Sequence, residues 1–199
     1  MKKLIFIATI TVIMFASCTK DNNSEISLSD QEKSDLIFLR QEEKLAHDVY
    51  VYAFGKYGIS IFDNISNSED THMDAVLTLM NKYNIIDPAA GMTEGVFEND
   101  DLQLLYQQLI SKVNLSSIQA LEAGATIEDL DISDITSFYK NTTKADIIQV
   151  YDMLTCGSRN HLRGFTGQLK TLNSIYSPQF LTVSEYQTIL SGSHEHCGK

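Results

Sequence analysis

The sequence is poor in basic side chains, in cysteine and in alternating apolar residues. Its 15 lysines and arginines stand against 26 aspartates and glutamates, so the formal net charge is −11. No basic patch is visible, which argues against nucleic-acid binding. The apolar runs beyond the N-terminus keep the helical period, which argues against a β-sheet. With 43% hydrophobic and 21% charged residues, the 199 residues have the composition of one ordinary globular domain.

The N-terminus has the features of an export signal rather than of a folded segment. Lys2 and Lys3 precede an apolar run over residues 4–15, which is shorter than a membrane span requires. The segment Ala16-Ser17-Cys18 resembles the cleavage box of bacterial lipoproteins, although Phe15 stands where that box usually has leucine. An ordinary secretory signal with a chance cysteine is the alternative.

The lipoprotein resemblance implies a signal peptide over residues 1–17 and a lipid on Cys18. Residues 18–28 are too poor in apolar side chains to fold and would form a flexible tether. We therefore expect the mature chain to be anchored to a membrane of the bacterial cell envelope, either periplasmic or surface-exposed.

Two cysteines remain, Cys156 and Cys197. In an oxidising compartment they either pair and pin the C-terminal tail to a helix, or stay as one buried thiol and one free thiol. The tail over residues 192–199 is polar and is expected to be mobile. His194, His196 and Cys197 offer ligands for copper or zinc, and a disordered tail is the alternative interpretation.

Apolar residues at three- and four-residue steps predict helices over about 29–57, 61–83, 100–113, 116–139, 144–172 and 183–190. A short first connection makes the first two antiparallel neighbours, and a long crossover over residues 84–99 precedes the third long helix. This layout is that of ferritin-like bundles. We predict an all-α, ferritin-like antiparallel four-helix bundle over residues 29–191. Its long crossover carries one short helix, and a short C-terminal helix follows the bundle.

Each long helix carries a polar group at the centre of its apolar face: Glu43, then Glu69 with His72, then Glu128, then His161. Such groups are costly to bury unpaired, and a metal ion compensates them. Neighbouring carboxylates fit less well, since Glu42 lies about 100° from the face centre and Glu122 about 120° from Glu128. Carboxylates and imidazoles suit iron or manganese, and the absence of cysteine from the set disfavours a structural zinc.

Several nearby residues complete the expected site. His47, one turn after Glu43, is a candidate additional ligand, and Tyr50, Ser158 and Asn160 are expected to surround the ligands. Ser158 stands where a second Glu-x-x-His pair of a di-metal bundle would need glutamate.

Other charged residues near the predicted site are expected to face solvent. Arg159 and Arg163 are expected to point outward. Asp129, Asp131 and Asp134 are expected on a solvated helix face.

Four segments carry a resemblance to a known family: residues 42–50, 64–76, 124–132 and 157–163. On these, the chain resembles the ferritin-like superfamily and, within it, domain-of-unknown-function family 2202. The resemblance covers about residues 34–190. It implies a four-helix bundle and no established activity.

The sequence thus favours a lipid-anchored ferritin-like protein that binds iron or manganese. If it is an enzyme, we expect a metal-dependent oxidoreductase acting on oxygen or peroxide. The alternative is a non-enzymatic structural or binding lipoprotein whose metal-free bundle satisfies its own polar groups. The expected partner is the membrane, and a homo-oligomer remains open.

Overall fold

A computed structural model describes residues 27–197, which are all-helical and contain no strand. The signal peptide over residues 1–17, Cys18 and nearly all of the tether lie outside the described residues. Four long helices dominate the fold: α1 (Asp30–Tyr57), α2 (Ser60–Lys82), α4 (Ser117–Phe138) and α5 (Ala145–Thr171). Two shorter helices, α3 (Asp100–Val113) and α6 (Val183–Ser191), and a 3₁₀ turn, η1 (Tyr139–Asn141), complete it. Within the described range, no helix has the length and apolar character of a membrane span.

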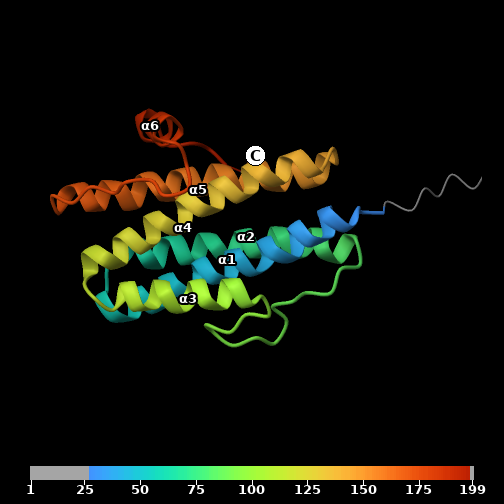
Figure 1. The fold of residues 1–199 in the computed structure, drawn as a ribbon, viewed down its shortest axis with the longest axis horizontal. Coiled ribbons are helices and arrows are strands. Elements are labelled where there is room, and N and C mark those ends of the chain that lie inside the picture. The colour runs from blue at the N-terminus through green and yellow to red at the C-terminus, as the bar shows by residue number, and fades with distance from the viewer. Residues whose placement is uncertain (1–26, 198–199) are drawn as a thin grey trace, which may run out of the picture.

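Local capping sets the ends of α1. Ser29 Oγ accepts a hydrogen bond from the Glu32 amide at 3.1 Å, and the Glu32 carboxylate accepts one from the Ser29 amide at 2.7 Å. This reciprocal capping box begins the helix. Gly58 ends it with a φ of 63°, a left-handed conformation that glycine adopts without steric cost. Because α2 begins only two residues later, α1 and α2 run antiparallel, as Figure 1 shows.

The long helices associate as two pairs. Helix α1 packs along α2 and α4 packs along α5, and contacts of α1 with α4 and of α2 with α5 join the pairs. Helix α3 lies in the long connection between α2 and α4 and packs on α1 and α4 (Figure 1). Helix α6 stands off from the others and contacts α5.

The hydrophobic core is divided into two clusters along the helix axes. One cluster contains Tyr50 of α1, Phe62 of α2 and Phe165 of α5. The other contains Leu39 of α1 and Leu154 of α5. Between them, each long helix contributes buried polar side chains at the same level. This polar layer interrupts an otherwise apolar interior and holds the candidate site.

The expectation of a solvated aspartate face on α4 is wrong for Asp129 and Asp131, which are both buried. Asp129 accepts hydrogen bonds from the Tyr176 hydroxyl at 2.7 Å and from the Leu181 amide at 2.9 Å. The segment that links α5 to α6 therefore folds back over α4. Helical periodicity cannot reveal this cover, because it comes from residues about 50 positions away in the chain.

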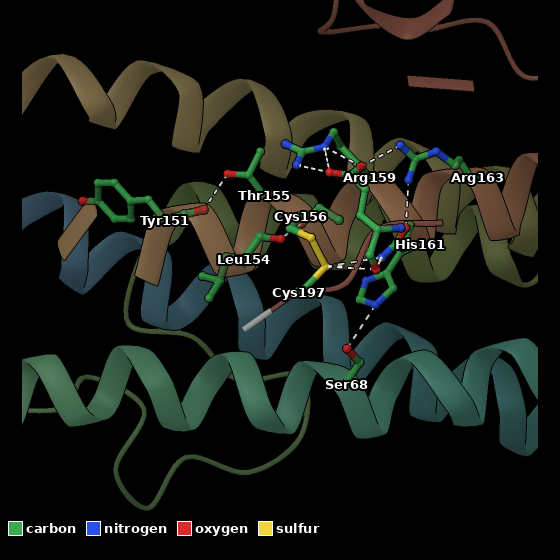
Figure 2. The surroundings of a disulfide bond; sticks show 12 residues. Ser68, Tyr151, Leu154, Thr155, Cys156, Arg159, His161, Arg163 and Cys197 are labelled. Atoms are coloured by element: carbon green, nitrogen blue, oxygen red, sulfur yellow. Dashed lines mark hydrogen bonds and ion pairs between the residues drawn. A yellow bond between two sulfur atoms is a disulfide. The ribbon is translucent and has the colours of Figure 1, made fainter. Parts of the chain in front are cut away.

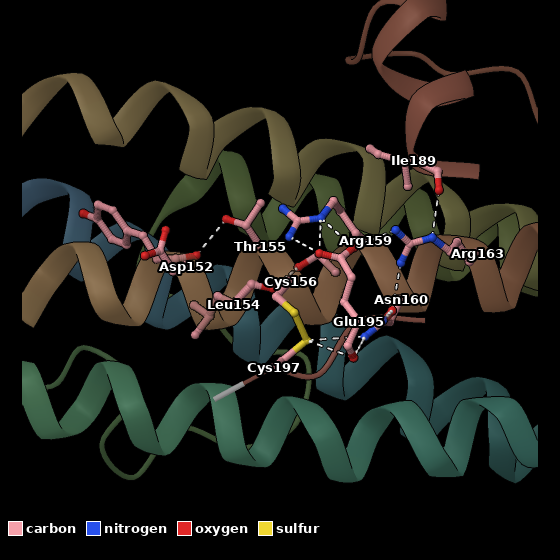
Figure 3. Close-up of polar contacts among 12 residues, drawn as sticks. Asp152, Leu154, Thr155, Cys156, Arg159, Asn160, Arg163, Ile189, Glu195 and Cys197 are labelled. Carbon is pink, nitrogen blue, oxygen red and sulfur yellow. Dashed lines mark hydrogen bonds and ion pairs between the residues drawn. A yellow bond between two sulfur atoms is a disulfide. The ribbon is translucent and has the colours of Figure 1, made fainter. Parts of the chain in front are cut away.

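The C-terminal tail, expected to be mobile, packs against α5 over residues 194–197. A disulfide joins Cys156 to Cys197, the first of the two alternatives that the sequence left open, with 5.6 Å between their Cα atoms (Figure 2). Arg159 and Arg163 turn away from the polar layer and both bind the Glu195 carboxylate (Figure 3). The hydrogen bond from Arg159, with help from Arg163, lowers the pKa of Glu195 to about 2.

Candidate metal centre

Five buried or nearly buried side chains meet in the polar layer, and they come from all four long helices: Glu43, Glu69, His72, Glu128 and His161. Each lies on the face of its helix that points between the two hydrophobic clusters. The helical period places them there, because each stands three, four or seven residues from apolar core residues of the same helix.

The five side chains form two groups that share Glu69. In the first group, His72 Nδ1 lies 2.6 Å from Glu69 Oε2 and 3.2 Å from Glu43 Oε2. In the second group, His161 Nδ1 lies 3.0 Å from Glu69 Oε1 and 3.4 Å from Glu128 Oε2. Within each group the candidate ligand atoms lie within 4.8 Å of one another. Glu69 therefore presents one oxygen to each group.

Close charge contacts dominate the second group. Glu69 Oε1 and His161 Nδ1 lie 3.0 Å apart as an ion pair, yet neither atom has a well-aligned hydrogen-bond partner among the described residues. Glu43 Oε1 is also unpaired. A buried polar atom left without a partner costs about 1–3 kcal/mol. Oxygen and nitrogen atoms that converge in this way fit a bound cation.

Two residues fix the orientation of the ligands. Ser68 Oγ lies 3.1 Å from His161 Nε2 (Figure 2). Because the Glu69 and Glu128 carboxylates raise the pKa of His161 to about 10, both nitrogens of the metal-free imidazole carry protons, and Nε2 donates to the serine hydroxyl. The Tyr50 hydroxyl donates to Glu128 Oε1 at 2.5 Å, which leaves Glu128 Oε2 to face His161. Hydrogen bonds of this kind hold metal ligands in a binding orientation.

The electrostatics of the layer are strongly coupled. Burial lowers the pKa of His161, but the Glu69 and Glu128 carboxylates outweigh burial and raise it to about 10. Burial raises the pKa of Glu43 to about 7, against the opposing hydrogen bond with His72. Burial alone would raise the pKa of Glu69, but the two histidines hold it well below its usual range. Protons and a metal cation therefore compete for the same atoms.

Two further predicted residues lie elsewhere. His47 falls outside both groups, because its nitrogens face Asp48 at 3.0 Å and Asp70 at 3.6 Å. Asn160 donates to the Glu195 carbonyl at 3.0 Å and so holds the tail rather than a ligand (Figure 3). 

Ser158 is buried in the layer, and no hydrogen bond joins it to the five ligands. Its hydroxyl shares one proton between the Leu154 carbonyl and Asp131 Oδ2. A carboxylate from α4 therefore lies beside the position where α5 lacks a glutamate.

Sequence reasoning missed Glu42, Asp131 and Ser68. Glu42 was set aside because it lies off the centre of the inner face of α1, yet only 2% of it is exposed. Helix α3 packs on α1 as well, so the buried arc of α1 is wider than one facing helix would make it. The adjacent pair Glu42–Glu43 in an apolar stretch was the available signal.

A cavity of about 410 Å³ connects the layer with the surface between α2 and α5. His72 and His161 lie at its inner wall, and the tail residues His194 and His196 line its outer part. Small molecules can reach the two histidines by this route, while the hydrophobic clusters close the layer above and below.

Comparison with known proteins places most of the chain in one group. The family model described as "Uncharacterized protein domain (DUF2202)" matches residues 32–193. The uncharacterized protein MJ0754 of Methanocaldococcus jannaschii is 47% identical over 168 residues, which cover 84% of this chain and 91% of that protein. The crystal structure of hypothetical protein MJ0754 from the same archaeon matches with a TM-score of 0.83 and 47% identity, over 84% of this chain and 96% of that one.

Proposed function

The chain belongs to the DUF2202 family, and we propose that its long helices form a ferritin-like four-helix bundle that binds two iron or manganese ions. The observation that carries the proposal is Glu69, whose two carboxylate oxygens face two separate ligand groups. Di-iron and di-manganese bundles build their centres from two single glutamates and two Glu-x-x-His pairs on four helices, and this chain supplies that set except for the glutamate of the second pair, where Ser158 stands.

The types of ligand atom indicate which metals the site would bind. Glu43, Glu69 and His72 would hold one ion, and Glu69, Glu128 and His161 the other. Oxygen and imidazole ligands without thiolate suit iron and manganese. Such a pair of ions, when bound in the reduced state, would supply electrons for reducing oxygen or peroxide, and an external reductant would return them, so we propose a metal-dependent oxidoreductase.

The chain's own residues provide the setting for this chemistry. Tyr50 and Ser68 hold Glu128 and His161 in place. The two hydrophobic clusters exclude bulk water on either side of the layer. The cavity beside α5 admits a small oxidant to the histidine face.

Metal content tests the proposal. Protein purified without chelator is expected to carry about two equivalents of iron plus manganese. The nearly isosteric Glu69→Gln variant should lose most of both, because the shared ligand is gone. Glu98→Gln, which alters an exposed carboxylate, is the matched control. Wild type and Glu69→Gln that both carry less than about a tenth of an equivalent would refute the proposal.

A metal-free bundle is the second candidate, favoured by the contacts of His72 with Glu43 and Glu69. Paired in this way, a protonated histidine and two carboxylates partly satisfy one another. This candidate predicts a melting temperature that does not change when Mn(II) is added, whereas a metal-binding native state is stabilised by mass action.

We also propose that a lipid on Cys18 anchors the protein in the cell envelope. The Ala16-Ser17-Cys18 segment supports this proposal, and so does the Cys156–Cys197 disulfide, since disulfides persist in oxidising compartments. Cys18→Ser should abolish labelling by a radioactive fatty acid and release the protein from membranes. If that variant still fractionates with membranes as wild type does, the proposed lipid anchor is refuted.

A further inference from the structure

A second set of buried carboxylates lies beside the five ligands, on the side of the layer between α1 and α4. Glu42 and Asp131 are 2% and 5% exposed, and neither belongs to the two ligand groups. They line a cavity of about 10 Å³ together with Glu43, Glu69 and Glu128. A cavity of that size holds one water molecule or one small cation.

The oxygens at this cavity lack partners. Both carboxylate oxygens of Glu42 and the Oδ1 atom of Asp131 have no hydrogen-bond partner among the described residues. Asp131 Oδ2 is different, because it accepts from the Ser158 hydroxyl. Ser158 thereby turns Asp131 so that Oδ1 remains available. Glu43 Oε1 is unpaired as well.

Burial does most to raise the pKa of the Glu42 carboxyl, and the acidic side chains of Asp131, Asp134 and Glu43 raise it further. Acidic groups therefore meet across α1 and α4. Lys44, the next basic side chain along α1, is not available, because its ammonium group binds Asp48 and the Thr93 carbonyl. Burial also does most to raise the pKa of Asp131, and the Glu43, Glu128 and Glu69 carboxylates raise it further, while the Ser158 hydroxyl lowers it.

The number of buried carboxyl groups is also consistent with a further cation. The layer buries five carboxylates: Glu42, Glu43, Glu69, Glu128 and Asp131. Two divalent ions in the Glu69-bridged groups would balance four of these five carboxyl groups when all are ionised. The remaining carboxyl and the neighbouring Asp134 are neutralised either by protons, which their raised pKa values favour, or by one further divalent ion. Uncompensated charges in a protein interior are strongly destabilising.

We propose that Glu42 and Asp131 form a third cation site, which takes a hard divalent ion through oxygen ligands alone. Glu43, whose Oε1 atom is also unpaired, lines the same cavity. This site goes beyond the two-ion centre, because Glu42 and Asp131 lie outside both ligand groups and no histidine lines the cavity. Oxygen-only ligands favour ions such as Mg²⁺, Ca²⁺ or Mn²⁺ over softer metals.

Titration of metal-stripped full-length protein with Mn(II) tests the third site. We expect three Mn(II) per chain for wild type, and two for Glu42→Gln and for Asp131→Asn. Glu98→Gln, the exposed control, should keep three. A large excess of Mg(II) should displace one of the three ions from wild type and none from Glu42→Gln, because imidazole ligands disfavour magnesium at the other two positions.

The outcomes separate this site from the two-ion centre. If wild type, Glu42→Gln and Asp131→Asn all bind two Mn(II) ions per chain, the third site is refuted and the two-ion centre is supported. A single ion that is lost in Glu42→Gln but kept in Glu69→Gln supports the third site and refutes the centre. No bound ion refutes both. Glu42→Gln replaces a buried carboxyl with a nearly isosteric amide, so the metal-free variant should melt close to metal-free wild type, and Asp131→Asn is an independent second test.

Discussion

Ser68 of α2 contacts His161 of α5. As a result, the two imidazole nitrogens of His161 face two successive residues of α2. Ser68 Oγ lies 3.1 Å from Nε2, while the carboxylate of the next residue, Glu69, lies 3.0 Å from Nδ1. The imidazole is therefore held in one orientation, with Nδ1 toward the carboxylates of the second ligand group.

Removing the Ser68 hydroxyl should weaken only the second ligand group. Loss of a hydrogen bond behind a histidine ligand typically costs about 10- to 100-fold in metal affinity. We expect Ser68→Ala to weaken one of the two Mn(II) binding steps in the Glu69-bridged centre by that factor, measured by calorimetric titration. Ser68→Thr keeps the hydroxyl and should bind nearly as wild type. Equal affinities for Ser68→Ala and wild type would contradict the assigned role.

Gly157 controls how closely α5 approaches the first ligand group. A Cβ atom at this position would lie 2.5 Å from His72 Nε2 and 2.6 Å from its Cε1. Gly157→Ala should therefore displace the His72 ring and reduce bound metal while the helices still form. Gly167→Ala is the matched control, because a Cβ there meets nothing within 4 Å. Metal content that is equal in the two variants would show that His72 does not depend on this contact.

Metal affinity should rise with pH, because binding displaces protons. In the metal-free protein the pKa of Glu43 is about 7 and that of His161 about 10, so between pH 6 and pH 7 both groups hold protons that a metal ion must replace. Each displaced proton steepens the dependence by about tenfold per pH unit, which predicts a 10- to 100-fold rise in Mn(II) affinity from pH 6 to pH 7. Calorimetry in two buffers of different ionisation enthalpy counts the released protons. Binding without proton release would contradict the assignment of these atoms as ligands.

The tail disulfide should stabilise the fold and restrict the cavity. Cys156 and Cys197 are 41 residues apart, a loop for which chain-entropy arguments give about 4 kcal/mol. We expect Cys197→Ser to lower the free energy of unfolding by up to that amount in urea denaturation. Because Cys197 and His196 line the cavity that leads to the histidines, the variant should also lose metal to a chelator faster.

Reduction of wild type with a mild thiol should reproduce the behaviour of Cys197→Ser. The same reductant should leave Cys197→Ser itself unchanged. If reduction changes neither the free energy of unfolding nor the rate of metal loss to the chelator, the tail does not restrict access to the cavity.

The structural features that can be predicted from the sequence are those that depend on residues close together in the chain. The helices begin at Ser29 and Ser116 because those side chains cap them, and the helical period turns Glu43 and Glu128 inward. What the sequence could not show depends on distant segments. Helix α3 covers the flank of α1 that carries Glu42, and Ser68 meets His161 across 93 residues. Neither contact leaves a periodic signal in the chain.

The central claim is that Glu69 bridges two metal ions. Anomalous diffraction from crystals grown with Mn(II), recorded on both sides of the manganese absorption edge, tests it most directly. The account predicts two anomalous peaks on opposite sides of the Glu69 carboxylate, one beside His72 and the other beside His161. The absence of peaks at Glu69, or a single peak that contacts only one of the two histidines, would contradict it.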